Sequence, residues 1–287
     1  MSSRVYYRPD LHIHSTYSDG TDDPKHLIEN ARKAELDLFA LTDHDTYEGC
    51  AAVQALLSPG DPHFVGGVEL SCKDEIGKYH VLGYCYDVSK PSIQEAVAFT
   101  HNVRRKKISH RLDYLREAHG IVFPEEEIAA LRQLKNPGRP HFVALLLNHG
   151  HVKTKAEGFE MMGGYHGTEP HLRPEEAIDA ILRADGVPVL AHGILADGSK
   201  HLTLEQITER VSRLKDAGLM GVEGYYSTYT PEEKAIMLSL AKEYNLLVTA
   251  GSDYHGTNKP IALGQTNDPE PPVMQRFYDA LRQLIMP

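Results

Sequence analysis

The chain has 287 residues, of which 41% are hydrophobic, so it is long enough for one large α/β domain or for a domain that carries an inserted module. Its formal net charge of -10 excludes a global positive field that would hold long duplex nucleic acid, although a small anionic substrate can bind where positive charge is concentrated. The three cysteines have neither paired nor zinc-knuckle spacing, and we expect reduced thiols.

No apolar run approaches the length of a membrane span, and residues 1–7 lack the apolar core of a signal peptide. We therefore expect a cytoplasmic protein without a membrane partner. The composition includes 17 histidines, which favours metal binding or acid–base chemistry over a purely structural role. Nothing in the sequence indicates the oligomeric state.

The first third of the chain alternates strand-like and helix-like segments. Apolar and β-branched runs predict strands, and Asp23 followed by Pro24 predicts the start of a helix. The expected strands cover residues 7–15, 36–42, 63–70 and 79–86, and a second helix covers residues 51–57.

The pattern changes near Pro91, where strand signals stop. Helical periodicity covers residues 92–119, 125–134 and 141–149, and the polar, glycine-rich residues 153–170 predict a loop. Residues 90–172 are therefore expected to form a helical insertion.

Strand and helix signals alternate again from Pro174 onward. Helix 174–184 and strand 187–192 are followed by two capping boxes, Thr203 with Gln206 and Thr230 with Glu233. Further strands are expected at residues 221–226 and 246–251. Repeated βα units favour a parallel sheet or a barrel, whereas a doubly wound open sheet is less favoured because no Gly-x-Gly-x-x-Gly follows a strand.

The sequence Asp10-Leu11-His12-Ile13-His14-Ser15 places two histidines on alternate residues of an expected strand. Alternate strand residues point to one face, so His12 and His14 should lie together, with Asp19 a few residues on. Imidazole and carboxylate ligands suit a transition metal, with Mn, Fe or Zn more natural than Mg. Taken alone, the motif is equally compatible with two surface histidines.

Ionisable side chains also lie in or after most of the other expected strands. They are Asp43, His44, Asp45, Glu69, His80, His192, Asp253 and His255. The carboxyl ends of parallel strands converge on one face, where sites are built. Individually, Asp43 or Asp45 could cap the next helix and His80 could be a hydrogen-bonded strand histidine, but the joint pattern predicts one site.

Four stretches of this chain together resemble the PHP (polymerase and histidinol phosphatase) family. They run from Asp10 to Gly20, from Leu41 to Asp45, from Gly67 to Ser71 and from Gly251 to Gly256. The resemblance implies a distorted (β/α)7 TIM-like barrel and a trinuclear site for three divalent metal ions. By motif position its ligands are His12, His14, Asp19, His44, Glu69, His80, His192, Asp253 and His255.

Within that family the chain is similar to stand-alone phosphoesterases that act on nucleotides, including 3',5'-nucleoside bisphosphate phosphatases. Their Gly-Arg-Pro-His segment resembles residues 138–141, inside a comparable helical insertion. The resemblance implies that residues 1–89 and 173–287 form a discontinuous catalytic barrel. Residues 90–172 would then form a cap that contributes to substrate binding.

The expected reaction is hydrolysis of a phosphate monoester of a small nucleotide, a 5'-mononucleotide or a 3',5'-nucleoside bisphosphate, by a metal-bridging hydroxide. The resemblance makes Glu69 the bridging carboxylate, and candidates for proton transfer are Asp43, Asp45 and His192. Arg139, with His141 as a second choice, is expected to contact substrate phosphate. The basic run 104–107 is more typical of a solvated helix face than of an anion-binding surface.

Other functions remain open at this point. Histidinol-phosphate phosphatase and 5'-3' exonuclease activity on short oligonucleotides use the same kind of site. A non-catalytic metal-binding scaffold is disfavoured by the complete ligand set. An amide-cleaving hydrolase is disfavoured because no lysine falls in a position to bridge two metals.

Overall fold

The computed structural model describes residues 8–196, 200–269 and 276–279. Its main sheet has seven strands in the order β1-β2-β3-β4-β5-β8-β9. They are β1 (Pro9–Asp10), β2 (Leu38–Leu41), β3 (His63–Lys73), β4 (Lys78–Tyr84), β5 (Val187–Leu190), β8 (Gly221–Tyr226) and β9 (Leu247–Gly251). A separate small hairpin pairs β6 (Leu195–Ala196) with β7 (Lys200–His201).

The sheet curls until its first and last strands approach each other. Leu11 N donates to Ala250 O at 2.9 Å, His14 N donates to Tyr254 O at 2.9 Å, and Ile13 and Tyr254 form an isolated parallel bridge. These bonds nearly close the sheet, and the predicted seven-stranded barrel-like fold is confirmed.

The parallel order of the sheet is interrupted at β4. This strand is antiparallel to both β3 and β5, while β1-β2-β3 and β5-β8-β9 are parallel. Only a short turn joins β3 to β4, and a turn of that length can connect antiparallel strands but leaves no room for a crossover helix.

The strand predicted at residues 7–15 is much shorter, because only Pro9–Asp10 pairs as β1, and Tyr7 lies outside the described residues. Beyond Asp10 the backbone bonds partly to side chains instead, since His12 N donates to Asp10 Oδ1 and Ile13 N to Thr42 Oγ1. The two histidines nevertheless face the same way, with ring centroids 5.2 Å apart.

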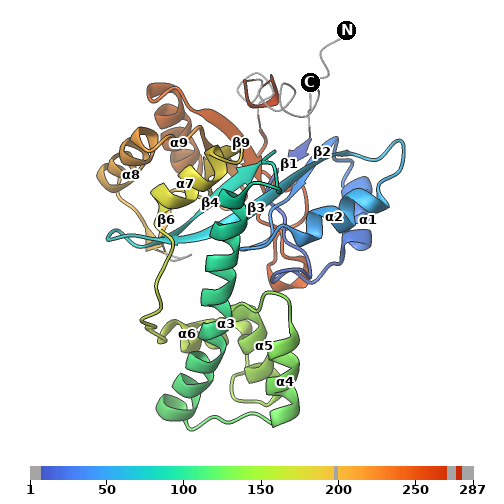
Figure 1. Ribbon diagram of the computed structural model, residues 1–287, viewed down its shortest axis with the longest axis vertical. Coiled ribbons are helices and arrows are strands. Elements are labelled where there is room, and N and C mark those ends of the chain that lie inside the picture. Colours follow the sequence, from blue (N-terminus) through green and yellow to red (C-terminus); the bar gives the residue numbers. More distant parts are fainter. Residues whose placement is uncertain (1–7, 197–199, 270–275, 280–287) are drawn as a thin grey trace.

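Five helices pack around the barrel, with α7, α8 and α9 on one side and α1 and α2 on the other (Figure 1). Asp23 caps α1 by accepting from His26 N, and both predicted capping boxes, at Thr203 and Thr230, are confirmed. The helices are α1 (Pro24–Lys33), α2 (Glu48–Leu56), α7 (Pro174–Leu182), α8 (Leu204–Asp216) and α9 (Pro231–Glu243).

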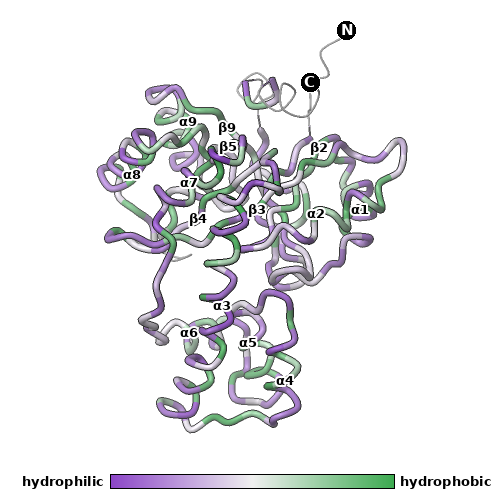
Figure 2. Tube along the Cα trace, in the orientation of Figure 1, coloured by the Kyte–Doolittle hydropathy of each residue, from purple (hydrophilic) through white to green (hydrophobic). Residues whose placement is uncertain are grey.

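The remaining helices form a lobe beside the barrel. Helix α3 (Pro91–His119) starts at the sheet and runs outward to α4 (Glu125–Gln133), α5 (Arg139–Asn148) and α6 (Lys155–Gly163) (Figure 1). The lobe has its own hydrophobic cluster, which includes Leu115 and Phe142, and α3 carries alternating hydrophilic and hydrophobic bands along its length (Figure 2).

The predicted loop at residues 153–170 is partly wrong, because residues 155–163 form α6. Thr154 caps this helix by accepting from Glu157 N, and Met162 is buried. A Cβ at Gly158 would lie 2.7 Å from Val143 Cγ1, so this glycine permits close packing of α6 on α5 rather than marking a turn.

No helix among the described residues combines the length and apolar character needed to cross a bilayer.

Candidate metal centre

The structure brings all nine predicted ligands together at one end of the barrel. His12 and His14 follow β1, Asp19 lies in the next loop, and Asp253 and His255 follow β9. The other four come from the β2, β3, β4 and β5 regions, and are His44, Glu69, His80 and His192. All except His80 are buried.

Glu69 lies at the centre of this cluster. Its Oε2 is 2.9 Å from His44 Nδ1, 3.1 Å from His14 Nε2 and 3.3 Å from His12 Nε2. Its Oε1 is 2.8 Å from His80 Nδ1 and 3.2 Å from His192 Nε2. Five imidazoles from different parts of the chain therefore meet at one carboxylate.

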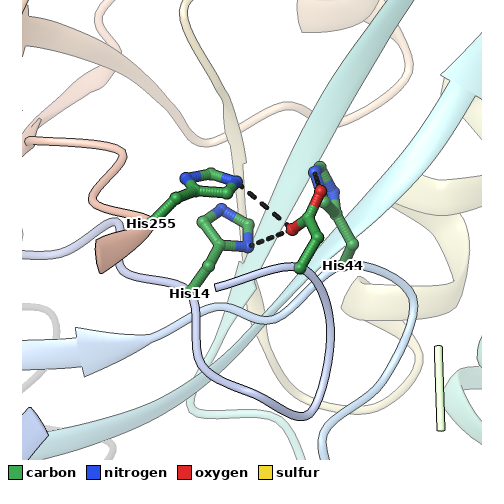
Figure 3. Close-up of side chains that lie close together, drawn as sticks. His14, His44 and His255 are labelled. Carbon is green, nitrogen blue, oxygen red and sulfur yellow. Dashed lines mark ion pairs between the residues drawn. The ribbon is translucent and has the colours of Figure 1, made fainter. Parts of the chain in front are cut away.

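Asp19 and Asp253 provide two further acidic positions. Asp19 Oδ1 is 3.2 Å from His255 Nε2 and 3.9 Å from His14 Nδ1, and Figure 3 shows the imidazoles of His14, His44 and His255 gathered at this carboxylate. Asp253 Oδ1 is 3.3 Å from His14 Nε2. Three groupings place all their ligand atoms within 4.8 Å of one another: His14 with Asp19, His44 and His255; His12 with His14 and Asp253; and His44 with Glu69 and His80.

The cluster fits cations because polar atoms at its centre are buried without hydrogen bonds. Among the described residues they include His12 Nε2, His14 Nε2, Asp19 Oδ1, His44 Nδ1 and Glu69 Oε2. Leaving such atoms unpaired is costly, and a divalent ion that accepts nitrogen and oxygen ligands would satisfy them together.

The three carboxylates remain ionised in this setting. Burial would raise the pKa of Glu69, but the imidazoles of His44, His80 and His12 outweigh it and hold that pKa well below its usual range. The pKa values of Asp19 and Asp253 are also well below their usual range. Neighbouring imidazoles overcome the effect of burial at Asp19, and Lys259 followed by imidazoles does so at Asp253. Ionised carboxylates are the form that binds metals.

Comparison with known proteins agrees with this site. The PHP domain family model matches residues 10–134. The chain is 30% identical over 267 residues to the 5'-3' exoribonuclease Rnm of Salmonella typhimurium, a match that covers 89% of this chain and 88% of that protein. The chain belongs to the PHP domain family.

It is a metal-dependent phosphoesterase, a hydrolase of phosphoric ester bonds. It is 29% identical over 254 residues to the phosphoribosyl 1,2-cyclic phosphate 1,2-diphosphodiesterase of Eggerthella lenta, covering 86% of this chain and 94% of that one. It is 27% identical over 285 residues to the 3',5'-nucleoside bisphosphate phosphatase of Chromobacterium violaceum, covering 96% of this chain and 97% of that one.

Two solved structures have the same fold. A chain from Bifidobacterium adolescentis assigned to the metal-dependent phosphoesterases superposes with a TM-score of 0.79 at 28% identity, covering 96% of this chain and 95% of that one. A Chromobacterium violaceum protein described as an amidohydrolase, solved with bound sulfate and no metal, superposes with a TM-score of 0.83 at 26% identity, covering 95% and 96%.

The two aspartates beside His44 hold the PHP site together. Asp43 accepts from Ser15 N at 2.8 Å, Ser15 Oγ at 2.6 Å and Ser18 Oγ at 2.5 Å, which fixes the loop between His14 and Asp19. Asp45 accepts from Ser71 N at 2.8 Å and is ion-paired with Arg104 of α3. Burial would raise the pKa of Asp45, but the Arg104 guanidinium lowers it overall, so Asp45 is a poor proton donor.

The backbone is strained where several of these residues lie. Asp45, His192 and Asp253 have φ angles of 53°, 29° and 57°, a region that residues other than glycine adopt rarely. Such strain persists only where the surroundings enforce it, and it clusters at functional sites.

Sequence reasoning missed two carboxylates that support the predicted ligands. Glu223 on β8 is fully buried, with Oε1 3.0 Å from His12 Nδ1 and Oε2 accepting from His192 N at 2.8 Å. Asp10 accepts from Ser252 N at 2.9 Å and Gly264 N at 2.8 Å, which ties the end of β1 to the chain after β9. The feature of the sequence that could have revealed them is a charged residue within a strand that is otherwise apolar.

The predicted substrate contacts lie where the helical lobe meets the barrel. A Cβ at Gly138 would be 3.1 Å from Asp19 Oδ2 and 3.4 Å from Arg104 Nη1, so the start of α5 lies beside the cluster. Arg139 is exposed at the first position of α5, and His141 Nδ1 accepts from Gly138 N at 3.0 Å. The interpretation of residues 104–107 as a solvated face is wrong for Arg104, which is partly buried against Asp45.

Proposed function

We propose that this PHP protein hydrolyses a phosphate monoester of a small nucleotide, a 5'-mononucleotide or a 3',5'-nucleoside bisphosphate, at a trinuclear metal site. The observation that carries the proposal is the convergence of unpaired, buried nitrogen and oxygen atoms around Glu69. The three groupings of ligand atoms support three ion positions.

The nine predicted ligands would hold the ions, and Glu69 is the residue suited to bridge, because both its oxygens face imidazoles. Bound divalent ions supply charge neutralisation for the phosphate and a hydroxide nucleophile near neutral pH. Histidine-rich mixed ligation favours Mn, Fe or Zn.

Of the residues predicted to transfer protons, we assign His192 to metal binding instead, because a nitrogen that binds a metal ion has no lone pair left for a proton. Its Nε2 faces the cluster, 3.2 Å from Glu69 Oε1. Asp43 is occupied by three hydrogen bonds from serines, and Asp45 is occupied by Arg104 and Ser71. We assign the two aspartates to positioning the loops that carry ligands.

We assign substrate binding to the lobe formed by residues 90–172, with Arg139 and His141 contacting phosphate. Arg139 is exposed at the start of α5 and follows Gly138, which lies beside Asp19, and its guanidinium forms no ion pair with any described residue. A planar guanidinium binds phosphate oxygens with two parallel hydrogen bonds. The relatives named above also support a phosphorylated ribose compound, since their names specify a nucleoside bisphosphate, a phosphoribosyl cyclic phosphate and RNA.

The test is a panel of phosphate esters assayed with chelated protein and with the same protein reloaded with Mn, Fe or Zn. The panel contains 5'-AMP, adenosine 3',5'-bisphosphate, histidinol phosphate, phosphoribosyl 1,2-cyclic phosphate and a short 5'-phosphorylated RNA. We expect phosphate release from a nucleotide only after reloading. Full activity in demonstrably metal-free protein, or no activity on either nucleotide after reloading, would refute the proposal.

A second candidate is 5'-3' exoribonuclease activity, favoured by the 30% identity to Rnm. It differs in the bond cleaved, since an exonuclease hydrolyses a diester and releases nucleotides one at a time. Fragment-length measurements on the RNA in the panel distinguish progressive shortening from loss of the terminal phosphate alone.

A further inference from the structure

One face of α3 carries a row of cations that leads away from the metal centre. Arg104, Lys107 and Arg111 are three and four residues apart, which places them on the same side of the helix. Since an α-helix rises about 1.5 Å per residue, Arg111 lies about 10 Å along the axis from Arg104. Only Arg104, the member beside the centre, is ion-paired, with Asp45.

Arg111 is held between aromatic rings instead of carboxylates. Its guanidinium carbon is 5.5 Å from the Phe142 ring centroid and 5.9 Å from that of Tyr165, and its Nε is buried with no hydrogen-bond partner. Aromatic faces attract a cation but do not neutralise its charge. The partly buried Arg111 guanidinium therefore keeps a positive charge that can attract an anion.

Glu169 offsets the positive charge of the row only in part. It attracts both Lys107 and Arg111, but its Oε1 lies 2.8 Å from His110 Nδ1 and accepts from the Tyr165 hydroxyl, and its Oε2 has no hydrogen-bond partner. Burial, reinforced by repulsion from neighbouring cations, lowers the pKa of Lys107 to about 8 and that of Arg111 to about 10. Neither cation has a carboxylate within ion-pair distance among the residues that the structure describes.

We propose that Lys107 and Arg111 form a subsite for a second phosphate group, one that is bound but not hydrolysed. This inference rests on the proposed function, because the reacting phosphate is taken to lie at the metal centre. It selects nucleotides with two separate phosphates and, within the proposed substrates, the 3',5'-nucleoside bisphosphate over the 5'-mononucleotide.

The charges favour a terminal phosphate over an internal one. A phosphate monoester carries a charge of about -1.5 to -2 near pH 7, which matches one lysine and one arginine, whereas an internal diester carries a single negative charge. Enclosure of Arg111 by Phe142 and Tyr165 also suits the end of a small molecule better than a continuing chain.

The test compares Lys107→Met and Arg111→Met with matched controls on the same helix, Lys106→Met and Arg105→Met, whose native side chains are exposed. In metal-loaded enzyme we expect each test variant to lose at least about 10-fold in kcat/KM on adenosine 3',5'-bisphosphate and less than about 2-fold on 5'-AMP. We expect the controls to match the wild type on both. Circular dichroism checks that each variant is folded, and the two test variants serve as independent tests.

A second measurement separates this inference from the proposed function. Calorimetric binding of adenosine 3',5'-bisphosphate to chelated protein reports the subsite without turnover, and we expect Arg111→Met to weaken it by at least about 10-fold. Equal binding by variant and wild type, equal losses on both nucleotides, or a loss confined to cleavage of 5'-phosphorylated RNA would overturn the subsite. Binding that depends on Arg111 in a protein inactive on every ester would instead overturn the proposed function alone.

Discussion

The two walls of the site have opposite chemistry. The barrel wall gathers carboxylates and imidazoles, several of whose buried atoms lack hydrogen bonds. The helical wall carries Lys107, Arg111 and Arg139, which form no ion pair with any residue that the structure describes. The barrel wall therefore favours bound cations, and the helical wall favours bound anions. A metal-bound phosphate ester would satisfy both walls, and local positive charge of this kind would let a chain with a net charge of -10 bind an anion.

The two walls also differ in how firmly their charged groups are held. On the barrel side, Glu223 and Asp10 hold the ligand-bearing segments through hydrogen bonds between parts of the chain that are far apart in sequence. On the lobe side, Arg139 is exposed and Arg111 is held by aromatic rings. We therefore propose that the barrel supplies fixed geometry and that the lobe selects the substrate, and three substitutions test this division.

The largest effect is expected for His14→Ala on the barrel wall. His14 belongs to two of the three ligand groupings, so its loss should remove bound metal and lower turnover on the order of 10³-fold or more. Metal content by mass spectrometry and phosphate release measure the two effects. His26→Ala, at an exposed position on α1, is the control. Normal metal content and turnover in His14→Ala would remove the basis for the barrel wall as a metal site.

An intermediate effect is expected for Glu223→Gln, which keeps the shape of the side chain. A carboxylate beside His12 Nδ1 favours the tautomer with the proton on Nδ1, leaving Nε2 free for a metal, whereas an amide that donates there favours the opposite tautomer. We expect metal affinity to fall about 10- to 100-fold, measured by calorimetric titration of the chelated protein. Glu232→Gln, at an exposed position on α9, is the control, and equal affinity in both variants would contradict a positioning role for Glu223.

The smallest effect is a pH dependence on the lobe wall. The pKa of Lys107 is about 8 because burial, Arg111 and Arg104 lower it more than Glu169 and Asp45 raise it. His171 also faces this lysine. A lysine is charged below its pKa, so the free enzyme loses this positive charge as the pH rises through about 8.

We therefore expect kcat/KM for adenosine 3',5'-bisphosphate to fall several-fold between about pH 7 and pH 9.5, with a smaller change for 5'-AMP. Lys107→Arg, which stays charged across this range, should flatten the difference between the two substrates. Profiles of Lys107→Arg and wild type that superimpose would show that Lys107 does not set this dependence.

Local features of the chain were predictable because they depend on neighbouring residues. The capping boxes at Thr203 and Thr230 and the common orientation of His12 and His14 follow from short-range geometry. The helix at residues 155–163 was missed because its glycines resemble turn residues, and Gly158 is explained only by its contact with Val143.

From residue chemistry and periodicity, the sequence by itself predicted a cluster of ionisable side chains and the position of the helical insertion. The barrel-like class and the full set of nine ligands came from the resemblance to the PHP family. Only the tertiary structure decided which imidazoles meet at Glu69, that Glu223 links His12 to His192, and that Arg104 pairs with Asp45 while Arg111 has no carboxylate partner among the described residues. The reason is that these contacts join residues far apart in the chain, and burial and charge balance depend on which side chains the fold brings together.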